Sequence, residues 1–335
     1  MAIILSVFLR GYRGKTVDFQ KVSHCHRTTT AYFLNHGKWD DIALQDTLKR
    51  SILHIIYREA QRSGQPVYCI VDDTIASHTR PSSQALHPIE AAYFHQSHLK
   101  GRQDYGHQVV SVMLSCNGIT LNYAVILYDK SKSKIQIVKE IAEELPIAPV
   151  VSYFLCDSWY TSSKVMDSFI RKGFYTIGAL KTNRILYPWG IRQKASLFAL
   201  HLRKTDPGVS LVTVGGRQFY VYRYEGELNG IPNAAVIISY PKDALGIPKH
   251  CGCFSLRMSV CQLWRYWRLI SNGGRSNYFS VKAKVNWHWI NISYRYPSGN
   301  PKILVDYVAG SFFCVACILK AIVLLKKVML FYRNS

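Results

Sequence analysis

Acidic residues are scarce in this chain. Aspartate and glutamate number 20 against 42 lysines and arginines, so the formal net charge is +22 at pH 7. Because the excess runs along the whole chain, we expect a polyanionic partner, with nucleic acid as the first candidate and an anionic membrane surface as the second. The plainer alternative is a basic globular enzyme that has no such partner.

A disulfide framework and a long hydrophobic segment are also missing. The nine cysteines are odd in number and irregular in spacing, which favours a reducing compartment. The apolar run 307–319 has 13 residues, whereas a membrane helix needs about 20. We therefore predict one large or two ordinary globular domains with no membrane partner. A basic membrane-associated protein anchored by residues 303–332 is the alternative.

The first third of the chain has the pattern of a packed helix. Residues 42–62 place Leu44, Leu48, Ile52, Ile55 and Ile56 at helical spacing, and Gly64 follows as a stop. The preceding stretch HRTTTAYFLNHGKW contains Arg27, which is a candidate for contact with DNA phosphates. An ordinary helical subdomain explains the spacing equally well.

From residue 66 onward the pattern alternates between strands and helices. Asn117-Gly118 is a strong signal for a hairpin turn. In chain order, the predicted elements are strands at 66–74 and 107–129, the second interrupted by that turn, a helix at 134–145, a strand at 149–157, a helix at 162–173 and a strand at 175–183. This order predicts an α/β fold with a mixed sheet flanked by helices, as in the ribonuclease H-like fold.

Two of the apolar strands run directly into aspartates, in VYCIVDDT (67–74) and PVVSYFLCD (149–157). In the predicted fold these strands are neighbours, so Asp73 and Asp157 meet at one edge of the sheet. Two such carboxylates repel each other unless a cation lies between them, and their hard oxygens favour Mg²⁺ or Mn²⁺ over zinc. Paired magnesium ions about 4 Å apart activate a water or a 3′-hydroxyl in phosphodiester cleavage. His107 is a further candidate for orienting part of the site.

Five blocks of this sequence resemble, in the same order, those of bacterial insertion-sequence transposases of the DDE type. They are HRTTTAYFLNHGKW, VDDTI, HPIEAAYFHQSHLKGRQDYGHQVV, LCDSWYTS and IGALKTNR, within about residues 24 to 190. The resemblance implies that Asp73, with Asp72 beside it, is the first catalytic acid and metal ligand, and that Asp157 is the second. It also implies that Lys181 and Arg184 lie near the active-site edge and contact DNA.

The resemblance implies a reaction, a cofactor and partners as well. The family cleaves DNA at the element ends with Mg²⁺ (or Mn²⁺) and transfers the freed 3′-hydroxyl to target DNA. The partners are then double-stranded DNA and, on that DNA, a second copy of the chain. The expected location is the bacterial cytoplasm, in association with the nucleoid.

The same resemblance suggests a division of the chain. Residues 1–64 would form a helical N-terminal DNA-contacting region, and residues 65–190 the ribonuclease H-like catalytic core. Residues 191–254 would form a β-rich insertion, since 209–241 alternates as strands do. Residues 255–335 would form a C-terminal helical region that completes the catalytic domain.

The expected third acid is missing from that last region. Aligning Lys284 with the family lysine places Asn277 where a glutamate belongs, and neighbouring registers give Ser276 or Arg275. No aspartate or glutamate occurs between Asp243 and Asp306. Lys282 and Lys284 remain candidates for DNA contact, because aromatic and basic residues alternate around them.

This departure from the family pattern favours an impaired enzyme. Loss of one carboxylate leaves a metal site with too few ligands. We interpret the chain as a degenerate copy, altered by substitutions or compensating frameshifts, and the alternative is a catalytically inactive DNA-binding remnant. Translation of the coding DNA in its other frames around codons 255–300 tests the frameshift version, which an unbroken reading without a hidden glutamate pattern would contradict.

Overall fold

A computed structural model gives the fold of the chain. It describes residues 40–80, 82–84, 92–97, 101–214, 217–247 and 251–257, together with isolated positions between 20 and 36. The predictions for Arg27, Asn277, Lys282 and Lys284 lie outside these residues.

The predicted N-terminal helix is confirmed as α4 (Asp41–Ser63). Asp40 caps it, because its side chain accepts a hydrogen bond from the backbone N–H of Ala43. Gly64 ends it in the left-handed conformation at φ 63°, which favours glycine. Ile52 and Ile56 are buried as predicted, whereas Leu44 is 42% exposed, so the first turn of the helix does not contribute to the core.

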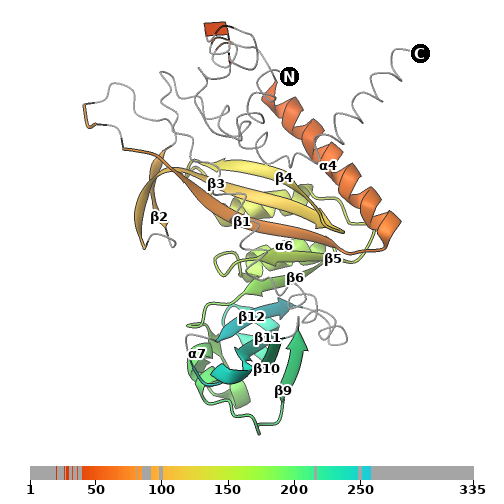
Figure 1. The fold of residues 1–335 in the computed structure, drawn as a ribbon, viewed down its shortest axis with the longest axis vertical. Coiled ribbons are helices and arrows are strands. Elements are labelled where there is room, and N and C mark those ends of the chain that lie inside the picture. The colour runs from red at the N-terminus through yellow and green to blue at the C-terminus, as the bar shows by residue number, and fades with distance from the viewer. Residues whose placement is uncertain are drawn as a thin grey trace.

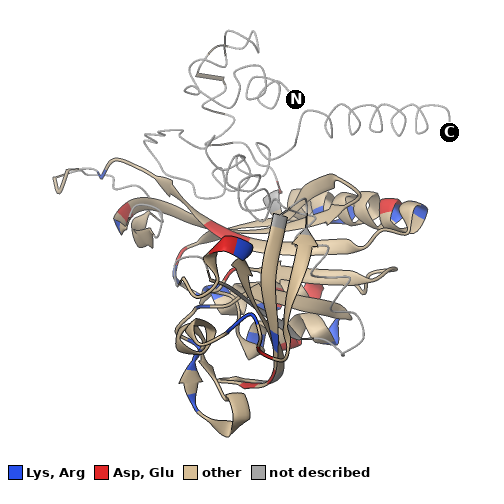
Figure 2. Cartoon of the chain, turned by 60° about the horizontal axis from the view of Figure 1, so that its bottom comes forward, with Lys and Arg blue, Asp and Glu red and all other residues tan. Residues whose placement is uncertain are grey.

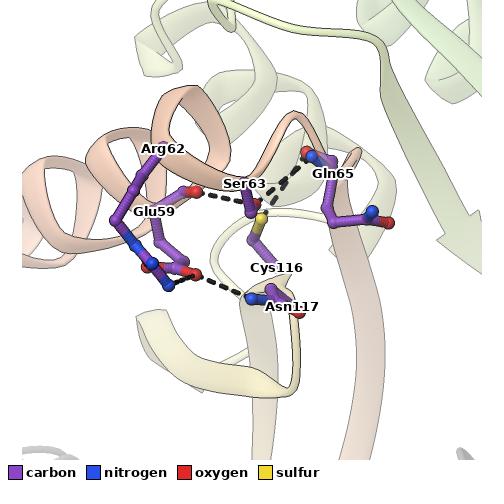
Figure 3. Close-up of polar contacts among 6 residues, drawn as sticks. All are labelled: Glu59, Arg62, Ser63, Gln65, Cys116 and Asn117. Carbon is purple, nitrogen blue, oxygen red and sulfur yellow. Dashed lines mark hydrogen bonds and ion pairs between the residues drawn. The ribbon is translucent and has the colours of Figure 1, made fainter.

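Polar contacts fasten the end of α4 to the hairpin between β3 (Arg102–Cys116) and β4 (Ile119–Tyr128). Figure 3 shows Glu59 between Arg62 of its own helix and the amide of Asn117, which donates a bond of 2.7 Å. Asn117 and Gly118 both have positive φ, as the predicted tight turn requires. The turn that links the two strands is therefore held against the helix.

The strands form one mixed sheet, which confirms the predicted α/β class and is compatible with the ribonuclease H-like fold. β1 (Val67–Ser77) pairs antiparallel with β3 and parallel with β5 (Ser152–Cys156), which in turn pairs parallel with β6 (Phe174–Ala179). The predicted adjacency of the two aspartate-bearing strands is thus confirmed. A short strand that the sequence did not reveal, β2 (Tyr93–Ser97), extends the sheet beyond β3.

Helices α5 (Lys134–Glu144) and α6 (Ser163–Arg171) share one core with α4. Alternate strand residues face this core, among them Val67, Phe154 and Phe174. Their neighbours along the strands form a separate aromatic row on the other face, in which Tyr68, Tyr153 and Tyr175 lie with ring centroids 5.5 and 5.7 Å apart.

The sheet continues beyond β6 into a second group of strands (Figure 1). The alternating stretch 209–241 forms three strands as expected: β9 (Val209–Val214), β10 (Arg217–Leu228) and β11 (Ile231–Pro241). β12 (Gly252–Arg257) joins β11 to β6. The smaller elements are β7 (Ile185–Leu186), η2 (Pro188–Gly190), β8 (Gln193–Lys194), α7 (Ala195–Leu200) and η3 (Lys242–Ala244).

The structure departs from the sequence prediction in the length of β1, and the start of α6 lacks a side-chain cap. β1 does not end at Asp73 but continues to Ser77, because β3 pairs with it that far, whereas β5 pairs only as far as Val71. Ser162 occupies the N-cap position of α6, but its side chain makes no capping bond there. Asp73 is therefore held within a paired strand instead of at a free strand end.

The basic residues of the described part are distributed along the chain, as the sequence predicts. Figure 2 shows lysine and arginine over several helices and strands and not in one cluster. Within the described ranges, no helix is long and apolar enough to cross a membrane. The apolar run 307–319 lies outside those ranges.

Candidate active site

Neighbouring parallel strands bring the two predicted carboxylates to one edge of the sheet. The pairing of β1 and β5 ends with Val71 opposite Cys156. Asp157 follows Cys156 directly, and Asp73 lies two residues beyond Val71. The carboxylates are close enough that the charge of Asp73 contributes to raising the pKa of Asp157.

Asp73 is held by two donors that reach the same oxygen. Gln108 Nε2, from the adjacent strand β3, donates to Oδ2 over 3.0 Å. Lys134 Nζ, from the first residue of α5, forms an ion pair with the same oxygen. Neither partner was predicted from the sequence. Two signals in the sequence point to them. Gln108 directly precedes the apolar run VVSVML, and Lys134 is a basic residue at the start of the helix predicted at 134–145.

Asp157 is fixed by the backbone that follows it. Its Oδ1 accepts the N–H groups of Trp159 at 2.9 Å and Tyr160 at 3.3 Å. Burial raises the pKa of this carboxyl, and the charge of Asp73 adds to the rise. The two backbone donors and Lys181 act in the opposite direction but do not cancel it. The side chain is therefore held in one orientation. Burial and the charge of Asp73 destabilise its ionised form, and a bound cation would stabilise that form.

Tyr160 provides a buried hydroxyl next to these carboxylates. The residue is fully buried, and among the described residues no group meets hydrogen-bond geometry with its Oη. Burial raises the pKa of the phenol strongly, and the charges of Asp73, Asp157 and Asp72 raise it further. Its position beside the three carboxylates makes Tyr160 part of the immediate surroundings of the candidate site.

The predicted DNA-contacting residues of the IGALKTNR block have different surroundings. Lys181 Nζ lies 5.1 Å from the ring centroid of Trp159, which is half exposed at the active-site edge. Arg184 instead donates to backbone carbonyls, to Thr161 at 2.6 Å and to Asn229 at 3.2 Å. Lys181 thus borders the site, whereas the visible contacts of Arg184 brace the loop behind it.

His107 contacts a second histidine beside the strand that carries Asp73. Its Nδ1 lies 2.8 Å from Nε2 of His78 on the extension of β1. Burial and the neighbouring His107 lower the pKa of His78 to about 4. Gln108, the residue after His107, donates to Asp73, and the orienting role of His107 stays a prediction.

Thr161 connects the Asp157 loop to β6. Its Oγ1 lies 2.9 Å from the carbonyl oxygen of Asp157 and 2.7 Å from that of Ala179. Gly178 makes this approach possible, because a Cβ there would come within 2.2 Å of Thr161 Oγ1. A close strand-to-loop contact thus helps to set the position of Asp157.

Replacing Gly178 by alanine is expected to lower the free energy of unfolding by about 1–3 kcal/mol, because the added methyl group overpacks against Thr161. Chemical denaturation measures this change. The matched control is Thr161→Ala, alone and combined with Gly178→Ala. Because the second substitution removes the clashing oxygen, the double variant should lose less stability than the sum of the single variants. Additive losses would show that Thr161 is not what limits the space at Gly178.

The donor set fits a hard divalent cation. Asp73 and Asp157 supply carboxylate oxygens, the ligands that Mg²⁺ prefers, and the hydroxyl of Tyr160 lies beside them. Within the part of the chain that the structure describes, no three histidine, cysteine, aspartate or glutamate side chains form a group able to bind a metal. The described residues therefore supply two carboxylates toward such a site.

A mixed sheet whose neighbouring parallel strands bring two aspartates to one edge is compatible with the ribonuclease H-like fold. Residues 63–214 match the family described as transposase DDE domain, and this segment includes both carboxylates. This match confirms the DDE-type transposase family that the sequence blocks indicated. The family implies a DNA substrate and generally uses a divalent metal ion. No curated protein matches the chain.

Proposed function

We propose that the chain is a transposase that cuts DNA at insertion-sequence ends in a metal-dependent reaction and joins the freed 3′-hydroxyl to target DNA. Its activity is reduced, because the third carboxylate is missing. The observation that carries the proposal is the convergence of Asp73 and Asp157 at one sheet edge inside the segment that matches the family.

The described residues suggest distinct roles in that reaction. Asp73 and Asp157 hold Mg²⁺ or Mn²⁺, which when bound lowers the pKa of water and stabilises the leaving oxygen. Gln108 fixes the orientation of Asp73, and the backbone after Asp157 fixes that of Asp157. Lys181 at the rim supplies a positive charge for a DNA phosphate, and Arg184 keeps the loop beside it in place.

The surrounding chain supports a DNA-bound assembly in this proposal. The net charge of +22 favours double-stranded DNA at element ends and at the target. A pair of copies on two DNA ends, in the cytoplasm and near the nucleoid, is the arrangement we propose. In it the helical region 1–64 and the basic residues Arg27, Lys282 and Lys284 contact DNA, the insertion 191–254 extends the core 65–190, and 255–335 completes it.

A catalytically inactive DNA-binding remnant is the second candidate. The observation that favours it is the absence of any aspartate or glutamate between Asp243 and Asp306, where the third acid is expected. Such a remnant would occupy element ends without cutting them. The two candidates differ in whether a metal-dependent product forms.

The test is a nicking assay on element-end DNA with Mg²⁺ or Mn²⁺, using the natural chain, Asp73→Ala and Asp157→Ala. The proposal expects slow nicking by the natural chain, which a chelator stops and which neither variant shows. DNA binding, measured by gel shift, should persist in both variants. Binding without any product from the natural chain would favour the remnant, and nicking that survives Asp73→Ala would overturn the assigned site.

A further inference from the structure

The metal-binding carboxylate Asp73 already has a cationic partner within the chain. Lys134 Nζ forms an ion pair with Asp73 Oδ2, and the side chains of both residues are largely buried, with 14% and 22% exposed. The same ammonium lies 5.4 Å from the ring centroid of Tyr128 and 5.3 Å from that of Trp159. The carboxylate of Asp73 and the faces of two aromatic rings therefore form a binding site for a cation.

The location of Lys134 shows that the helix itself does not favour this lysine. It is the first residue of α5, where Ser133 caps the helix by accepting the N–H of Gln136. The positive end of the helix dipole lies there, so an acidic side chain would be favoured and a basic one is disfavoured. The helix has no acidic residue in its first turn. The ion pair with Asp73 offsets this unfavourable placement.

Lys134 and a divalent ion would compete for the same oxygen. A magnesium ion binds carboxylate oxygens at about 2.0–2.1 Å and tolerates little distortion of its ligand geometry. Oδ2 of Asp73 already receives both Lys134 and Gln108. An ammonium in contact with the same carboxylate would also repel the incoming cation.

We propose that Lys134 is an internal counter-ion of Asp73 that a divalent metal ion must displace, so that it sets the affinity of the site for metal. This inference rests on the proposed metal-dependent function. While the metal is absent, the ammonium neutralises the carboxylate. When the metal binds, the ammonium gives up its contact with Asp73 Oδ2.

The experiment is a calorimetric titration of the full chain with Mn²⁺ in the absence of DNA. Lys134→Met is expected to bind Mn²⁺ at least 10-fold more tightly than the natural chain. Lys134→Arg retains the charge and should not gain affinity. Lys132→Met is the matched control, because Lys132 pairs with Glu140 at 2.8 Å and belongs to the same loop. Unchanged or weaker binding by Lys134→Met would overturn the proposal.

Asp73→Asn and Asp157→Asn separate this inference from the proposed function. Suppose that Mn²⁺ binding depends on both aspartates but Lys134→Met binds Mn²⁺ with the same affinity as the natural chain. Then only the counter-ion role of Lys134 fails. If none of the chains binds Mn²⁺, the metal-dependent function fails as well. Should Lys134→Met be unfolded without metal, the proposal expects Mg²⁺ to restore its circular dichroism, since the ion replaces the lost positive charge. Failure of Mg²⁺ to do so would overturn it.

Discussion

Replacing Asn277 by glutamate is expected to raise the rate of DNA cleavage on the order of 100-fold, which corresponds to a barrier lower by about 2.7 kcal/mol. The physical reason is that two carboxylates leave a divalent ion with too few protein ligands and the developing charge with too little stabilisation. The alignment of Lys284 with the family lysine places Asn277 at the missing acid. Single-turnover nicking of element-end DNA measures the gain.

Two variants make this result specific. Asn277→Gln adds the same length of side chain without the charge and should leave the rate unchanged. Asp73→Ala combined with Asn277→Glu should lose the gain, because the new acid acts only within the same metal site. The neighbouring registers are tested with Ser276→Glu and Arg275→Glu. If none of the three glutamates raises the rate while DNA binding persists, the missing acid is not what limits cleavage.

The sheet and its two carboxylates were predictable because a buried strand appears in a sequence as a short run of apolar residues. Residues 67–71 and 153–156 form largely apolar runs, and each run leads into an aspartate. The neighbouring parallel placement of the two strands follows from the order of strands and helices. The turn at Asn117-Gly118 was predictable for the same local reason, since a two-residue hairpin turn requires two successive positive φ values and asparagine followed by glycine adopts them readily.

The partners of Asp73 were not predictable from such patterns. Lys134 lies 61 positions further along the chain, and it reaches Asp73 only through the packing of α5 against the sheet. The continuation of β1 past Asp73 also depends on tertiary pairing, since β3 extends further than β5 does. Local propensity predicts the helices and strands. The length over which two strands pair, and the partner of each charged side chain, depend instead on which elements pack together.

An aromatic cluster packs against the strand that leads into Asp157. Phe169 of α6 is fully buried, stacks on Phe154 of β5 at 3.7 Å between ring centroids, and meets Phe174 of β6 edge-on at 5.7 Å. β5 is the strand that leads into Asp157. This cluster therefore ties the helix to the strands on which the site is built.

Phe169→Ala is expected to lower the free energy of unfolding by about 3–5 kcal/mol, because it leaves a cavity and removes two aromatic contacts. The midpoint of denaturation by urea, compared at equal slope, measures the change. Ile170→Ala is the matched control, since Ile170 is the next residue of the same helix but 39% exposed, and it should change stability by about 0.5 kcal/mol. Equal losses from the two substitutions would show that α6 does not pack through Phe169. A loss confined to Phe169→Ala, accompanied by weaker Mn²⁺ binding, would show that the cluster also holds Asp157 in position.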